Sequence, residues 1–132
     1  MMPCAGLYTA CTLQQSVIIL FFMKQYVIDE LRLTDYELLK TYLSEHYGPA
    51  AMGNIYWIPV EHGLLTEVQK THRQCQPHYF AVNLAENRMA LELLVRTQSS
   101  MRCDCIRYAT EAQRNWLIAL IDGIFNKLAI MT

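Results

Sequence analysis

Glycine is scarce in this chain of 132 residues, which contains five glycines and no glycine-rich phosphate loop. Without such a loop, nucleotide hydrolysis and dinucleotide binding are disfavoured. The sequence also lacks the GxSxG pattern of many hydrolases, the HExxH pattern of zinc proteases and a recognisable sugar-hydrolase pattern. These absences weigh against an enzyme, although they leave that question open.

Charge is also sparse, because charged residues make up 17% of the chain and the first of them is Lys24. Hydrophobic residues make up 53%, so the composition excludes a disordered chain, a collagen-like chain and a coiled-coil rod. The net charge of −1, from 11 basic and 12 acidic residues, disfavours a dedicated nucleic-acid binder.

A long apolar run is missing as well. The densest run, Val17–Phe22, is far shorter than the roughly 20 residues that span a bilayer. No positive charge precedes it, as a secretory signal would require. We therefore expect a cytoplasmic protein without a membrane segment, whose single domain covers residues 23–132. Residues 1–22 are read as an extension ahead of a natural start at Met23, as a weak membrane or export segment, or as an extra element packed on the domain.

The five cysteines do not form a disulfide framework. Two of them, Cys4 and Cys11, precede Met23, which leaves three in the expected domain. An odd number without regular spacing argues against a secreted disulfide scaffold and favours a reducing compartment.

Periodicity and turn residues predict one α+β domain with the order β-α-β-α-β-β-β-α. The pattern of Thr followed three residues later by Glu or Gln predicts helix starts at Thr34 and Thr110. The mixed order suggests helices packed on one face of a mostly antiparallel five-stranded sheet. The predicted strands are 25–32, 55–58, 78–84, 88–96 and 101–108, and the predicted helices run from Thr34 to about 47, from 64 to 73 and from 111 to about 129.

Two hairpins set the predicted register of the last three strands. A two-residue turn at Glu86-Asn87 creates an entirely apolar face. For the next hairpin we prefer the register that keeps Arg102 and Asp104 out of the core, since burying unpaired charges is costly. The predicted pairs are Leu84 with Met89, Val82 with Leu91, Phe80 with Leu93, Val95 with Cys103, and Leu93 with Cys105.

Five soft or borderline metal ligands occur in two short segments: His72, Cys75 and His78, then Cys103 and Cys105. Zinc needs four ligands, so a metal-stabilised domain is one interpretation. Zinc ribbons, however, space their paired cysteines by two residues, and a Cys-x-Cys strand is commonly a pair of small core residues. We favour core thiols with ordinary loop histidines and no cofactor, and keep zinc as the alternative.

The opposite face of the predicted meander carries Arg96 beside Arg102, with Tyr79 and Tyr108 on the same side. Paired arginines are suited to a small anionic ligand. Aromatic rings beside arginines can also stack nucleic-acid bases, but the Gly-Phe-rich strand of an RNA-recognition domain is absent. These four residues form the predicted ligand site.

This face is half apolar and half charged. A face exposed to solvent would be more polar, and a face buried against other elements would carry fewer charges. We therefore expect a non-enzymatic binding module that associates with itself, as a homodimer or a larger homo-oligomer. The alternatives are a small ligand-binding protein or enzyme with an anion pocket near Arg96 and Arg102, and a module stabilised by metal through the histidine and cysteine ligands.

Overall fold

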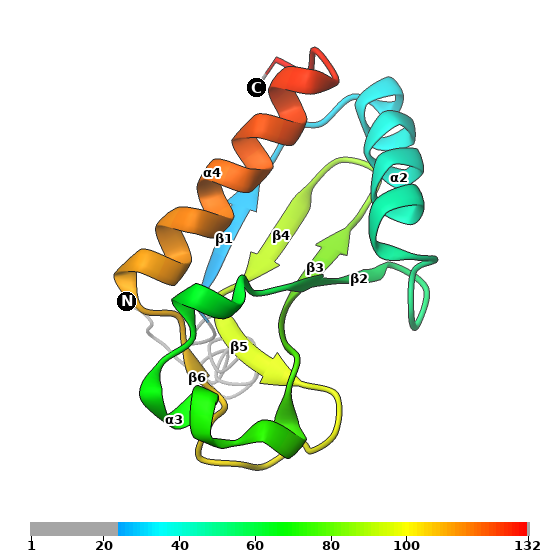
Figure 1. Cartoon of the computed structure of the whole chain (residues 1–132). Coiled ribbons are helices and arrows are strands. Elements are labelled where there is room, and N and C mark those ends of the chain that lie inside the picture. Colours follow the sequence, from blue (N-terminus) through cyan, green and yellow to red (C-terminus); the bar gives the residue numbers. More distant parts are fainter. Residues whose placement is uncertain (1–23, 132) are drawn as a thin grey trace, which may run out of the picture.

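Residues 24–131, which the computed structural model describes, form helices and a six-stranded sheet whose strand pairings are all antiparallel (Figure 1). The strands are β1 (Gln25–Ile28), β2 (Ile55–Pro59), β3 (His78–Leu84), β4 (Met89–Glu92), β5 (Leu94–Thr97) and β6 (Arg107–Tyr108). The helices are α2 (Leu33–Tyr47), α3 (Glu67–Thr71) and α4 (Glu111–Lys127), with short 3₁₀ turns η1 (His62–Leu64) and η2 (Arg73–Cys75). The predicted α+β class is confirmed, whereas residues 1–22 lie outside the described part.

Helices α2 and α4 cover the same face of the sheet, as Figure 1 shows. Side chains two apart on a strand share a face, so every second residue of each central strand faces the helices. Leu39 and Leu43 of α2 and Leu117 and Ile121 of α4 are fully buried in this core. They pack in one cluster with Ile58, Phe80, Val82, Leu84, Met89, Leu91 and Val95 of the sheet.

Strand β3 lies at the centre, with β2 along one edge and β4 followed by β5 along the other. The turn at Glu86-Asn87 is confirmed, because the Ala85 N–H donates to the Arg88 carbonyl at 2.8 Å. The pairs Leu84 with Met89 and Val82 with Leu91 are also confirmed.

The predicted strand 88–96 is interrupted at Leu93, which gives six strands where five were expected. Val82 pairs with Leu91, and Tyr79 pairs with Arg96. Between these two pairs β3 advances by three residues whereas the opposite segment advances by five, so the opposite segment contains a bulge. The predicted pair of Phe80 with Leu93 is therefore wrong. At the bulge the Leu93 N–H donates to the Lys24 carbonyl, and its own carbonyl accepts from Ala109.

The predicted strand 101–108 is wrong except for its last two residues. Strand β6 pairs Leu94 with Tyr108 and Val95 with Arg107, so neither cysteine of the Cys-x-Cys pair lies opposite Val95 or Leu93. Residues 98–106 instead form the loop between β5 and β6. A local turn, in which the Ile106 N–H donates to the Cys103 carbonyl at 3.0 Å, replaces the strand pairing.

The predicted helix 64–73 is also divided, into η1, α3 and η2. Its break follows from a capping box that begins α3 after Thr66, where the Gln69 N–H donates to the Thr66 hydroxyl at 3.2 Å. Leu65 is buried as expected, but Val68 is exposed and Gln69 takes the inward position.

No helix within residues 24–131 has the length and apolar character that a membrane crossing requires.

The two predicted helix starts have different outcomes. The box at Thr110 is confirmed, because the Gln113 N–H donates to the Thr110 hydroxyl and the Thr110 N–H donates to the Gln113 amide oxygen. The start at Thr34 is wrong, since α2 begins at Leu33. There the Asp35 carboxylate accepts from the backbone N–H and the guanidinium of Arg32.

These bonds make the start of α2 sensitive to acid, and Asp35→Asn tests this. The hydrogen bonds from Arg32 lower the pKa of Asp35, so its stabilisation is complete above the ordinary value of about 3.9 and is lost as the pH falls through the lower folded value. We expect Asp35→Asn to be less resistant to urea than the native chain at pH 7, with the difference shrinking below about pH 4. Asp122→Asn, at an exposed position on α4, should match the native chain at every pH.

Candidate metal centre

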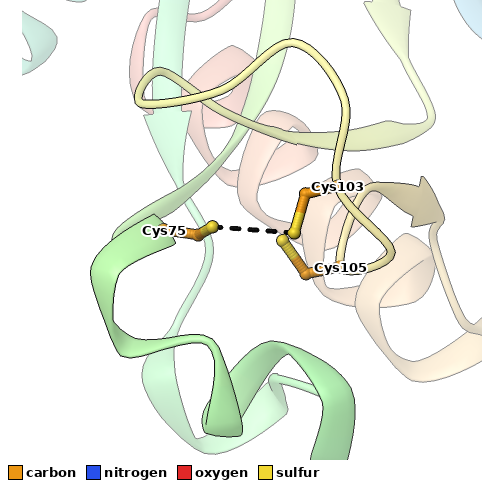
Figure 2. A group of neighbouring side chains, drawn as sticks. All are labelled: Cys75, Cys103 and Cys105. Carbon is orange, nitrogen blue, oxygen red and sulfur yellow. Dashed lines mark hydrogen bonds between the residues drawn. The ribbon is translucent and has the colours of Figure 1, made fainter.

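Three cysteine sulfurs from two separate segments lie close together. Cys75 belongs to η2, whereas Cys103 and Cys105 belong to the loop between β5 and β6. All three sulfurs lie within 4.8 Å of one another, and the Cys75 thiol donates to the Cys103 sulfur at 3.7 Å (Figure 2). Cys75 and Cys105 are buried, while Cys103 is half-buried. Among the described residues, these three thiols are free of disulfides.

The position of Cys75 follows from the turn that ends the α3 region. The Cys75 N–H donates to the His72 carbonyl at 3.0 Å and closes η2. The hydroxyl of Thr97, at the end of β5, donates to the Cys75 carbonyl. One bond therefore shapes the turn, and the other ties it to the sheet.

The Cys105 side of the cluster is held by two buried glutamines. Gln69 of α3 donates from its amide nitrogen to the Cys105 carbonyl at 3.2 Å. The Gln69 amide oxygen accepts from the amide nitrogen of Gln113 of α4 at 3.0 Å. Gln113 also donates to the Leu64 carbonyl at 2.9 Å. We call Gln69 and Gln113 with these contacts the glutamine relay, and it links α3, α4 and the cysteine loop.

Sequence reasoning missed Gln69 altogether and assigned Gln113 only to a helix cap. Both occupy the fourth position of a capping box, after Thr66 and Thr110 respectively. The pattern at Thr66 was readable in the sequence and would have located the start of α3. The tertiary contact of each amide group was not readable, because it depends on which elements pack together.

The thiols differ in their acidity. A hydrogen bond from the backbone N–H of Cys105 is the main cause that lowers the pKa of the Cys103 thiol. Burial raises the pKa of the Cys105 thiol to about 12. Ionising all three sulfurs in this space requires a compensating positive charge, which a bound divalent cation provides.

Two of the predicted ligands, His72 and His78, lie outside the group of sulfurs that are within 4.8 Å of one another. His72 is half-buried, and its Nδ1 bonds to the Val68 carbonyl at 2.6 Å, which leaves Nε2 for another partner. It lies near enough to help lower the pKa of Cys103.

His78 has a different environment. It is 1% exposed, and neither ring nitrogen has a hydrogen-bond partner among the described residues. Burial is the main cause that lowers its pKa, with a smaller contribution from His72, so the ring is neutral at pH 7. It lines a hollow of about 280 Å³ with residues such as Val60 and Leu65, and no cysteine contributes to that lining.

The four residues of the predicted anion site are not gathered as expected. Tyr79 lies opposite Arg96 in the sheet, but Arg102 lies in the 98–106 loop and is not opposite Arg96. The Arg96 Nε donates to Glu92 at 2.5 Å, so its charge is already compensated. Tyr108 lies in β6 opposite Leu94. The predicted pairing of Arg96 with Arg102 is wrong because the strand that would have carried Arg102 is a loop.

Comparison with known proteins found no match: no protein-family model, no curated protein and no solved structure is similar to this chain. A function therefore has to be argued from the chemistry of its own residues.

The glutamine relay makes a stability prediction, tested by Gln69→Leu. The substitution keeps the side-chain bulk but leaves the Cys105 carbonyl and the Gln113 amide without their partner. At about 1–3 kcal/mol for each of the two buried groups left unpaired, we expect the free energy of unfolding in urea to fall by about 2–6 kcal/mol. Gln74→Leu, at an exposed site in η2, should change it by less than about 0.5 kcal/mol. Equal effects of the two substitutions would contradict this role.

Proposed function

We propose that this chain is a non-enzymatic binding module whose fold is stabilised by one zinc ion held by Cys75, Cys103 and Cys105, with His72 as the fourth ligand. The observation that carries the proposal is the spacing of the sulfurs. Tetrahedral zinc with Zn–S bonds of about 2.3 Å places its sulfur ligands about 3.8 Å apart. The Cys75 and Cys103 sulfurs are 3.7 Å apart, and the third lies within 4.8 Å of both.

The type of ligand supports zinc over the harder cations. Thiolates favour zinc and monovalent copper, whereas magnesium and calcium require oxygen ligands. Of the described residues, no carboxylate joins the group within 4.8 Å. Three thiolates and one imidazole form a closed tetrahedral set, which is typical of structural zinc rather than of a catalytic ion with an open position.

We choose His72 as the fourth ligand because its Nδ1 is already held by a backbone carbonyl, which leaves its Nε2 for the metal. Zinc-bound histidines commonly donate their second ring N–H to a backbone carbonyl, as His72 Nδ1 does to Val68. His78 instead faces the hollow that contains no cysteine.

A zinc ion at this position would tie the 98–106 loop to η2, and thereby join residues 28 positions apart. Because binding stabilises the folded state, zinc at about 1,000 times its Kd should raise the free energy of unfolding by about 4 kcal/mol. The expected result is one zinc per chain by elemental analysis, a Tm that falls on treatment with a chelator, and recovery when zinc is added.

Cobalt substitution and two histidine variants test the ligand set. Cobalt at this site should show the visible bands of tetrahedral cobalt with thiolate ligands. His72→Ala should weaken zinc binding by more than about 100-fold, which exceeds the usual effect of a residue outside the ligand shell. His62→Ala, at an exposed site in η1, should leave it unchanged. The proposal would be refuted if the chain purifies without metal and its Tm is changed neither by a chelator nor by added zinc.

A second observation favours self-association as the activity of the module. The face of the sheet away from the helices has a hollow of about 560 Å³, lined by Trp57, Glu92 and Arg96 and flanked by Met52 and Met101. The two methionines are 91% and 94% exposed and lie at the same hollow, so together they add a continuous apolar surface to it. A two-fold contact centred on this hollow would set the Arg96–Glu92 ion pair of one chain against the same pair of the other, so the surface brings no unbalanced charge into the contact.

Light scattering at increasing concentration tests this second candidate. We expect a dimer that becomes a monomer in the double variant Met52→Glu and Met101→Glu, because the added charges repel across a two-fold contact. Met131→Glu, at an equally exposed position lining a different hollow, should remain a dimer. A native chain that stays monomeric at millimolar concentration would exclude the idea.

A further inference from the structure

Two of the three thiols, Cys75 and Cys103, are in direct contact. The sulfurs of Cys75 and Cys103 are 3.7 Å apart, in hydrogen-bond contact and directed toward one another (Figure 2). Cys103 lies in a loop without regular secondary structure, so its backbone can shift by the small distance that separates this contact from a bond of about 2.05 Å. This contact is the basis for choosing the pair, and a bond within the Cys103-Asp104-Cys105 segment is the competing outcome.

Accessibility assigns different roles to the same thiols. Cys103 is the only half-buried member of the cluster, whereas Cys75 is 5% exposed and Cys105 is 0% exposed. A small oxidant arriving from solvent therefore meets the Cys103 sulfur first. The Cys75 sulfur, 3.7 Å away, is placed to act as the resolving thiol, and Cys105 is the most buried of the three.

We propose that Cys75 and Cys103 are a reversible oxidation site for hydroperoxides, and that their disulfide displaces the zinc. This inference rests on the proposed function for the release of metal, but not for the choice of the pair. In the zinc-loaded site both sulfurs are thiolates. With hydrogen peroxide, the Cys103 thiolate attacks one oxygen, the O–O bond breaks, and sulfenic acid forms while the released hydroxide takes a proton from solvent and leaves as water. The Cys75 thiolate then attacks the sulfenic sulfur, the S–S bond forms as the S–O bond breaks, and the second hydroxide takes a proton from solvent and leaves as water.

The two thiolates together lose two electrons to the peroxide, and two protons from solvent complete the two waters. Zinc keeps its charge throughout and leaves because only Cys105 and His72 remain as ligands. A thiol reductant of the glutathione class reverses the reaction by exchange and restores both thiols.

The disulfide would connect the same two segments that the metal connects. Both crosslinks join η2 to the 98–106 loop, across 28 positions of sequence. Oxidation therefore exchanges one crosslink for another, and the folded domain survives the loss of its metal. The state of the site changes without unfolding, which is the property of a peroxide-responsive switch.

The test uses the full chain with Cys4→Ser and Cys11→Ser, so that three thiols remain. The zinc-loaded protein is treated with hydrogen peroxide while a coloured chelator records released zinc. Free thiols are then alkylated in denaturant, and the disulfide is located by peptide mass spectrometry. We expect one zinc released for each Cys75–Cys103 disulfide, alkylation of Cys105, and a Tm that stays well above that of the reduced, metal-free chain.

A parallel arm with the reduced, metal-free chain separates this inference from the proposed function. In that arm Cys105→Ser should still form the disulfide, whereas Cys75→Ser should proceed to sulfinic acid at Cys103. Zinc that binds but is not released, or a disulfide that involves Cys105, would overturn the inference and leave the zinc module standing. A chain that never binds zinc would overturn the metal-release step and the proposed function together, whatever pair it forms.

Discussion

Two buried amide groups control how the parts of this domain fit together. Gln69 and Gln113 each close the capping box of their own helix with the amide oxygen, and each uses the amide nitrogen for a distant backbone carbonyl. The bond between the two side chains joins α3 to α4. A buried amide without partners is costly, so these elements are stable mainly in the arrangement that satisfies all of the bonds at once.

The convergence of the cysteines depends on that arrangement. Cys105 is placed by its carbonyl, which the relay holds, and Cys75 by its carbonyl, which Thr97 holds. Cys75 and Cys105 are therefore positioned by contacts of their own carbonyl groups, not of their sulfurs. This leaves the thiols themselves free to bind a metal or to form a bond with each other, and either crosslink would reinforce contacts that already exist.

Sequence patterns correctly predicted those elements that depend on interactions between residues a few positions apart. The box at Thr110 and the turn at Glu86-Asn87 depend on hydrogen bonds between near neighbours, and both are confirmed. The predicted strand at 101–108 failed because Cys-x-Cys alternation resembles a half-buried strand, while the burial of Cys105 comes from the loop and the relay. The bulge at Leu93 was missed because its bonds to Lys24 and Ala109 involve neighbours that no hairpin rule includes.

The sequence by itself determined the α+β class, the long helix α4 and the inward face of the central strands, since periodicity and capping depend on local sterics and hydrogen bonds. It also contained every residue of the candidate metal centre, in two segments that could be interpreted either as one metal site or as core thiols and loop histidines. Only the tertiary structure decided that Cys75 meets Cys103 and Cys105, and that Arg96 pairs with Glu92 rather than lying beside Arg102. Such contacts join segments far apart in the chain, and packing between elements, which has no local signature, sets their distance.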